Sequence, residues 1–211
     1  MDIDLSTLNP DTLNPEALGI LLSISLGLGL AAASGFRIFV PMLLVSGASL
    51  SGHLELSSGF AWIGTYPALI AFGIATALEV GAYFIPWVDN FLDSIGAPAA
   101  AIAGTVVAAS TIVGLDPMMK WTLAAIAGGG AAGVVHSGMA MIRGGSSMTT
   151  GGLANPLVST VEAGGSFVLA FLAIVVPFAG LLAVVLVAYV CSRLLRRWRR
   201  RSEPVGHLGP A

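Results

Sequence analysis

The chain has 211 residues, of which 56% are hydrophobic and only 9% are charged, and its formal net charge at pH 7 is −2. A soluble domain typically carries about 25% charged residues, so the composition excludes an ordinary soluble protein, and a mean hydropathy of +0.91 indicates a lipid environment. The single cysteine, Cys191, excludes an internal disulfide and a cysteine-based metal cluster.

Residues 1–16 predict a short polar tail. They hold four acidic residues and no basic one, the reverse of the basic segment that opens a secretory signal peptide. A transmembrane helical domain is expected over residues 17–195, and a basic C-terminal tail over residues 196–211. The chain therefore divides into an acidic tail, a membrane domain and a basic tail.

Seven hydrophobic segments predict an all-α, polytopic membrane bundle of seven spans. The second segment is short and contains Pro41, so a re-entrant loop there, which leaves six spans, is the alternative. Polar or turn-forming stretches separate the segments, among them WVDNFLDSIG and RGGSSMTTGGLAN. The segments are 17–34, 36–53, 65–87, 97–114, 119–142, 155–176 and 178–195.

Basic residues predict the orientation of the bundle. Six of the nine lie between Arg193 and Arg201, and with seven spans Arg37 and Arg143 fall on the same side of the membrane as this cluster. Because cytoplasmic loops collect Lys and Arg, we interpret Arg37 and Arg143 as boundary charges. The C-terminus is then cytoplasmic, and the N-terminus and Lys120 are external. The Arg193–Arg201 cluster is suited to anionic lipid headgroups, and the distribution of basic residues does not favour a nucleic acid.

A weak internal repeat emerges when the chain is shifted by 83 residues. Glu79 then aligns with Glu162 in a shared Glu-x-Gly-x-x-Phe pattern, and the second to fourth segments align with the fifth to seventh. Three spans in each unit give the units opposite orientations, which is the inverted-repeat plan of many transporters. A 3+3 inverted repeat and chance matching of Gly- and Ala-rich segments both remain open.

Two stripes of polar residues lie in the third and sixth segments. Spacings of three and four residues place each stripe on one helix face. Extension of the first stripe to Asp93 is conditional, because Pro86 can kink or end the third span. Glu79 and Glu162 are the acids within the spans, where a charge costs about 2.5–3.5 kcal/mol on insertion scales, so both are expected to face the bundle interior. The first stripe holds Glu79, Tyr83, Pro86, Asn90 and Asp93, and the second holds Asn155, Ser159, Glu162 and Ser166.

The two glutamates have a structural and a functional interpretation. They satisfy a backbone group or pair with His136 or Tyr83, or they handle a proton or a small cation along a polar interior path, with His136 as a relay. Asp89 and Asp93, one helical turn apart, are weak candidates for binding a hard cation, and the alternative is that they cap and solvate a loop. The sequence holds no catalytic and no cofactor-binding motif, so an enzyme is the less favoured class.

Runs of Gly and Ala are the remaining feature of the spans. GLGLAAASG and AAIAGGGAAGVVHSG contain many small residues, and the second run includes the GxxxG pair Gly129 and Gly133. Small faces let helices approach closely in a membrane, so we expect tight packing within the bundle. Unwinding of the helix at Gly128–Gly130 is the alternative.

Three blocks of sequence, AAASGFRIFVPML, LEVGAYFIPWVDNFLD and TTGGLANPLVSTVE, carry a family resemblance. They resemble a family of small bacterial integral membrane proteins catalogued as domain of unknown function 4126. The resemblance covers roughly residues 18–190 and implies a multi-pass protein of the bacterial inner membrane. It implies no activity and no catalytic residues.

These observations lead to three hypotheses of function. The first is a small transporter or channel-like protein, with Glu79 and Glu162 in its interior path and a small ion or solute as its cargo. The second is a non-transporting accessory subunit whose Gly/Ala faces dock on other helices, in a homo-oligomer or beside a partner membrane subunit. The third is an intramembrane enzyme acting on lipid, which lacks a recognisable nucleophile–base pair.

Overall fold

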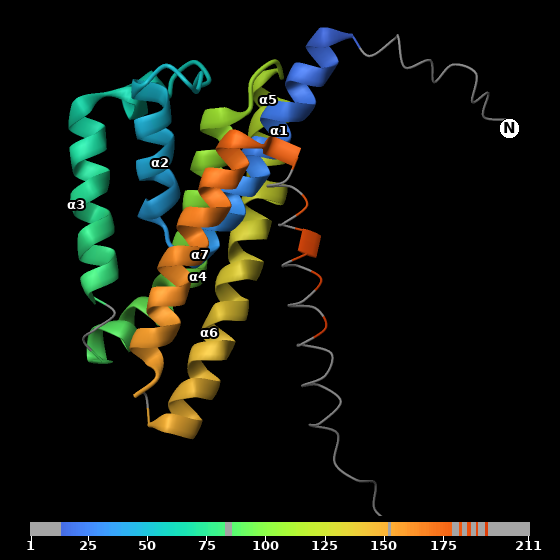
Figure 1. The fold of residues 1–211 in the computed structure, drawn as a ribbon. Coiled ribbons are helices and arrows are strands. Elements are labelled where there is room, and N and C mark those ends of the chain that lie inside the picture. The colour runs from blue at the N-terminus through green and yellow to red at the C-terminus, as the bar shows by residue number, and fades with distance from the viewer. Residues whose placement is uncertain are drawn as a thin grey trace, which may run out of the picture.

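The computed structural model describes residues 14–82, 86–151 and 153–178, together with residues 182, 185, 186, 189 and 193. This part of the chain consists of helices and short connections and contains no strand (Figure 1). The predicted all-α class is therefore confirmed. The elements are α1 (Pro15–Phe36), α2 (Phe39–Leu50), the 3-10 turn η3 (Ala61–Gly64), α3 (Tyr66–Ala82), α4 (Pro86–Thr111), α5 (Pro117–Leu123), the π-helical turn η4 (Ala124–Gly129), α6 (Gly130–Thr150) and α7 (Asn155–Val175).

Three helices are long and apolar enough to cross a membrane, by length and composition: α1, α7 and the continuous 34-residue helix that α5, η4 and α6 form together. Three shorter apolar helices accompany them, Phe39–Leu50, Tyr66–Ala82 and Ile95–Thr111. The chain thus has the character of a membrane protein. The predicted seventh segment, 178–195, lies largely outside the described residues, so the count of seven spans stays a prediction.

Helix α1 lies at the centre of the bundle and packs mainly on α4, α7 and α6. The run Ala31–Ala33 is fully buried, and its small side chains let neighbouring backbones approach. Gly35 makes the closest approach among the described glycines of α1, because a Cβ there would lie 2.5 Å from the carbonyl oxygen of Ala132 on α6. A Cβ on Gly104 of α4 would likewise lie 2.6 Å from the Cβ of Ala132. The Gly/Ala runs therefore pack against one another within the chain.

The long helix stays helical through its glycines. At Ala124–Gly129 it widens into a π-helical turn instead of unwinding at Gly128–Gly130. Gly129 faces α4 closely, since a Cβ on it would meet Thr105 Oγ1 at 2.6 Å, whereas a Cβ on Gly133 would meet only Ala101 Cβ, at 4.0 Å. The first glycine of the predicted GxxxG pair is thus the one that α4 approaches closely.

Two polar stretches predicted as breaks are helical. WVDNFLDSIG forms the first turns of α4, where Pro86 at the start of a helix and acids in the first turns are favourable. RGGSSMTTGGLAN begins inside α6, which continues to Thr150 and ends at Gly151 with a φ of 63°. The described members of the first polar stripe are therefore divided between α3, which holds Glu79, and α4, which holds Pro86, Asn90 and Asp93.

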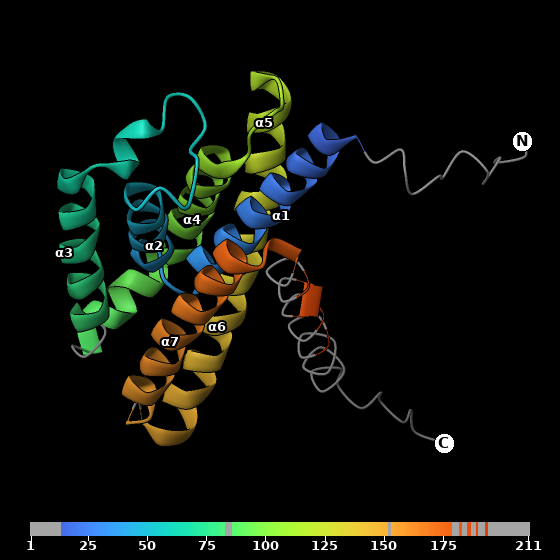
Figure 2. The same cartoon turned by 45° about the horizontal axis from the view of Figure 1, so that its top comes forward.

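Helices α2 and α3 form a pair on one side of the bundle (Figure 2). The connection between them contacts the rest of the protein through Ser57, whose backbone N–H donates to the Ser110 carbonyl at 2.8 Å. The ammonium of Lys120 donates to the Ser57 hydroxyl at 2.6 Å. Lys120, which the sequence places in an external connection, is thus a buried contact between α5 and this loop.

A buried charged cluster and the cavity beside it

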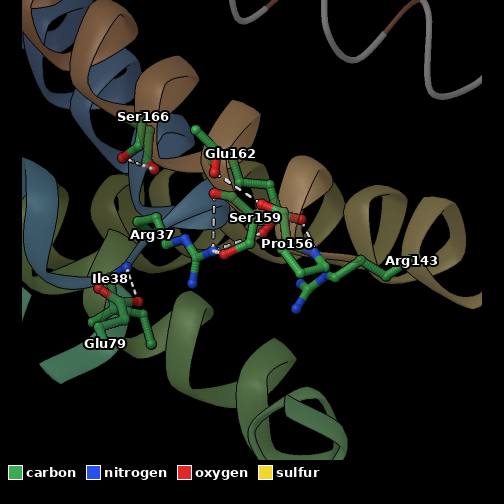
Figure 3. Close-up of polar contacts among 10 residues, drawn as sticks. Arg37, Ile38, Glu79, Arg143, Pro156, Ser159, Glu162 and Ser166 are labelled. Carbon is green, nitrogen blue, oxygen red and sulfur yellow. Dashed lines mark hydrogen bonds and ion pairs between the residues drawn. The ribbon is translucent and has the colours of Figure 1, made fainter. Parts of the chain in front are cut away.

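Glu162 lies between two arginines at the centre of the candidate site (Figure 3). Its Oε2 is 3.3 Å from Arg37 Nη2, and its Oε1 is 3.1 Å from Arg143 Nε. Glu162 is 0% exposed, Arg37 1% and Arg143 2%. The three residues come from α7, the α1–α2 junction and α6, so the ion pairs join three separate parts of the chain.

The polar stripe of α7 faces the same junction. Arg37 Nη2 donates to the Ser159 carbonyl at 3.1 Å and also to the Ser159 hydroxyl. One turn beyond Glu162, the Ser166 hydroxyl donates to the carbonyl of Ala33 on α1 at 2.9 Å. Ser159, Glu162 and Ser166 are all buried, as expected for one face of a helix.

Asn155, the first member of this stripe, contacts the last turns of α6. Its Nδ2 donates to the Ser147 hydroxyl at 3.0 Å, at the corner where α6 is followed by α7. The side chain is only half-buried. Asn155 thus belongs to the connection between the two helices.

The side chains of Arg37 and Arg143, interpreted from the sequence as boundary charges, are buried against Glu162, so the ion pairs account for their positions and a place at the membrane boundary stays a prediction. Burying an isolated charge is expensive, and an ion pair with good geometry is what makes such burial tolerable. Sequence reasoning missed these pairs, since nothing in helical spacing joins α7 to the α1–α2 junction. A search for counter-ions of the two intramembrane glutamates would have pointed to these pairs. The candidates are few, because Arg37, Lys120 and Arg143 are the basic residues outside the C-terminal cluster. The orientation prediction now depends on Arg193–Arg201.

Glu79 has a different environment, at the N-terminus of α2. Its Oε1 accepts the backbone N–H of Ile38 at 2.8 Å, and its Oε2 accepts that of Phe39 at 3.0 Å. No side chain of α2 itself caps this end. The first N–H groups of a helix lack intrahelical partners and carry partial positive charge, which a carboxylate satisfies. Glu79 of α3 therefore caps α2 from a neighbouring helix.

A cavity of about 440 Å³ lies beside Glu79. Its walls come from α1, the start of α2, α3, α4 and α6, and they are mostly apolar. Glu79 and His136 are the titratable groups of this lining. The lining residues are Ser34, Phe36, Ile38, Phe39, Ala75, Leu78, Glu79, Ala82, Leu92, Ile95, Gly96, Ala99 and His136.

His136 reaches the cavity from α6. It is 4% exposed, and its Nε2 has no hydrogen-bond partner among the described residues. The imidazole packs directly on Gly96 of α4, where any side chain would overlap Nε2. The lack of a Cβ at Gly96 is thus what leaves room for the ring beside the cavity.

The remaining predicted site residues are not brought into the site. Tyr83 lies outside the described residues, and the same holds for the side chains of Asn90, Asp89 and Asp93. Within the described part of the chain, no group of three His, Cys, Asp or Glu residues is placed to hold a metal ion. The cation site suggested for Asp89 and Asp93 therefore stays a prediction.

Comparison with known proteins identifies the family. The model of the family described as domain of unknown function (DUF4126) matches residues 24–197. The chain belongs to this family. The DUF4126 match includes Arg37, Glu79, His136, Arg143 and Glu162, so the cluster and the cavity both lie within the family domain. No curated protein and no solved structure matches the chain.

Proposed function

We propose that the protein is a small transporter or channel-like membrane protein that handles protons at Glu79. One observation carries the proposal: Glu79 and His136, two titratable side chains from different helices, line the same otherwise apolar cavity. Titratable groups within membrane helices commonly mark proton or ion pathways. The buried ion pairs of Glu162 lie next to this cavity through Arg37, whose backbone precedes the N–H groups that Glu79 accepts.

The two glutamates have different roles in this proposal. Glu162 is held by two guanidinium groups at 3.1 and 3.3 Å, which repel any incoming cation. At an effective dielectric constant near 20, one unit charge at 4 Å from another contributes about 4 kcal/mol. Glu162 is therefore a fixed counter-ion, and the proton is favoured over a small metal cation as the species that the site handles.

Within the cluster, Glu79 is the group that we propose takes up and releases the proton. Among the described side chains, Arg37 and Arg143 contribute two positive charges, and Glu79 and Glu162 contribute two negative charges when ionised. Protonation of Glu79 makes the net charge of this buried region more positive by one and weakens the cap on α2. A proton at Glu79 therefore changes both the local field and the start of a helix.

The proposal includes seven spans with an external N-terminus, for which the arginine-rich C-terminal tail is the remaining support. It does not require the inverted repeat. The 83-residue shift aligns the 12-residue helix α2 with part of the continuous 34-residue helix. Glu79 accepts backbone N–H groups, whereas Glu162 pairs with guanidinium groups. The two halves thus differ in form and in chemistry.

The accessory-subunit hypothesis has less support. It relies on Gly/Ala faces that are free to dock on partner helices. Gly35 of α1, Gly104 of α4 and Gly128 of η4 are in close contact with neighbouring helices, although Gly130 of α6 has open space around it. The small residues therefore account for the packing of the monomer.

The test compares Glu79→Gln with Glu55→Gln in proteoliposomes, with proton flux reported by an internal pH dye. Gln keeps the shape of Glu and removes the titratable proton, and Glu55 is an exposed control for the same change. We expect Glu79→Gln to fold, as judged by its melting temperature in detergent, and to lose proton flux and its pH dependence. Parent-like flux and pH dependence in folded Glu79→Gln would refute the role assigned to Glu79.

A further inference from the structure

We propose that the cavity beside Glu79 binds a small monocarboxylic acid, whose carboxylate replaces that of Glu79 at the N-terminus of α2. This inference deepens the proposed function and rests on it, because the exchange requires Glu79 to take a proton. It assigns a ligand class to the cavity: an acid group joined to a compact apolar body.

The contacts of Glu79 define the head-group site. Its two carboxylate oxygens accept two consecutive N–H groups, one oxygen each, at 2.8 and 3.0 Å. Helix N-termini bind anions through such N–H groups, and α2 is long enough, at 12 residues, to have an aligned dipole. Glu79 is therefore an internal occupant of a carboxylate site, and a carboxylate from a ligand makes the same two bonds.

The shape and lining of the cavity define the rest of the ligand. Ligand pockets commonly measure about 300–1,000 Å³ and are lined mainly by apolar groups, and this cavity of about 440 Å³ fits that description. At about 30 Å³ per water molecule it has room for roughly 15 waters, or for a short-chain or single-ring acid. Apolar walls such as Phe36, Leu78 and Ile95 do not replace the hydration shell of a bare ion, but they do accept hydrocarbon.

His136 is the second, independent indication of a ligand. It is more than nine-tenths buried and lines the cavity, and its Nε2 has no hydrogen-bond partner among the described residues. A buried polar atom without a partner costs about 1–3 kcal/mol. A polar group on a bound molecule, the second oxygen of its acid group included, removes that cost.

The exchange conserves protons and charge. The ligand enters as the undissociated acid, its O–H bond breaks, and the proton passes to an oxygen of the Glu79 carboxylate. The ligand carboxylate then accepts the N–H groups of Ile38 and Phe39, and the neutral Glu79 carboxyl turns away from them. One negative charge stays at the N-terminus of α2 throughout, so the balance against Arg37 and Arg143 is unchanged.

Among the described side chains, few charged or titratable groups surround Glu79. Arg37 acts on it from the α1–α2 junction, His136 of α6 lines the same cavity, and Arg143 and Glu162 belong to the cluster that includes Arg37. On α4, the side chains of Asp89 and Asp93 lie outside the described residues. Binding that takes up the acid and its proton together is expected to weaken as pH rises.

The test measures thermal stabilisation of the detergent-purified protein by butyrate, benzoate, chloride, butylamine and oleate, between pH 5 and pH 8. Butyrate and benzoate are expected to stabilise the parent at pH 5, with an effect that falls at least tenfold in apparent affinity by pH 8. Stabilisation by chloride or butylamine equal to that by benzoate overturns the proposal. Stabilisation by oleate alone also overturns it, because the ligand is then a long lipid acid.

Two substitutions separate the head-group site from the cavity. Glu79→Ala leaves the α2 N–H groups uncapped, so benzoate is expected to raise its melting temperature more than that of the parent, and equally at pH 5 and pH 8. Ala75→Leu fills the cavity and leaves Glu79 in place, so it is expected to abolish the effect of benzoate. Ala71→Leu, one turn earlier on the exposed side of α3, is the matched control and keeps the effect.

The outcomes distinguish this inference from the proposed function. If the parent conducts protons in liposomes without any carboxylate and neither acid stabilises it, the inference fails and the proton role stands. If the acids stabilise the parent and Ala75→Leu abolishes this, but no proton flux is measured with or without them, the proton-transport role fails. An effect of benzoate that survives Ala75→Leu places the ligand elsewhere and overturns the inference.

Discussion

Neutralising Glu162 is expected to destabilise the protein severely, and removing Arg143 as well is expected to restore part of the loss. Glu162→Gln removes the carboxylate that pairs with both Arg37 and Arg143, and both guanidinium groups stay buried. Arg143→Met alone removes one of the two ion pairs of Glu162 and leaves the pair with Arg37. In the double variant the Arg143 charge no longer lacks the carboxylate of Glu162, so part of the cost of Glu162→Gln is removed.

The structure sets the size of these effects. Breaking a buried ion pair by removing one partner typically costs 3–5 kcal/mol, and the carboxylate of Glu162 serves two such pairs, at 3.1 and 3.3 Å. We expect Glu162→Gln to cost about 3–5 kcal/mol or more, a large share of a typical stability of about 5–15 kcal/mol. The double variant should be more stable than the sum of the single effects predicts, by about 1–3 kcal/mol.

The assay is unfolding of the purified protein in detergent, followed by helical circular dichroism, with Glu55→Gln as the exposed control. Four proteins complete the cycle: the parent, Glu162→Gln, Arg143→Met and the double variant. Additivity of the two single effects within about 0.5 kcal/mol would show that Glu162 and Arg143 do not interact in the folded protein. A Glu162→Gln protein as stable as the parent would refute the stabilising role assigned to the two ion pairs of Glu162.

Three further predictions concern packing, hydrogen bonding and topology. Gly104→Val is expected to prevent tight association of α4 with α6, because Ala132 already occupies the space of a Cβ; near-parent melting would contradict this. Ser166→Ala should cost about 1 kcal/mol through loss of the bond to the Ala33 carbonyl, whereas Ser137→Ala, on an exposed face, is the control. Cysteines placed in the two tails of a Cys191→Ser background should be labelled from opposite sides of the membrane, and labelling from the same side would favour six spans.

The sequence predicted the helical class and much of the helix positions because apolar composition and length are local properties. The spacing of Ser159, Glu162 and Ser166 placed them on one face of a helix, and in the structure all three are buried. These features depend on the period of a single helix and require no knowledge of its neighbours.

The partners of the glutamates were not predictable in the same way. Glu79 caps a helix that starts some forty residues before it, and Glu162 pairs with an arginine at that same helix start. Such contacts depend on how helices pack, which local periodicity does not encode. The polar stretches around Arg143 and Asp89 were likewise predicted as breaks between helices. The hydrophobic pattern does not show that Arg143 has a buried partner, and it does not show that the acids near Asp89 lie at the start of a helix.

The position of Arg37 has a consequence for biogenesis. Arg37 is synthesised before Glu79 and long before Glu162, so the first helices of the protein are made before the carboxylate with which Arg37 pairs exists. A charge without a counter-ion is costly in the apolar part of a bilayer, so Arg37 is expected to stay in contact with water or headgroups until α7 arrives. The final packing of α1 and α2 is then expected only after α7 has been synthesised. A chain truncated before α7 would leave Arg37 and Arg143 both without Glu162, so the earlier helices are expected to pack less stably than in the full chain.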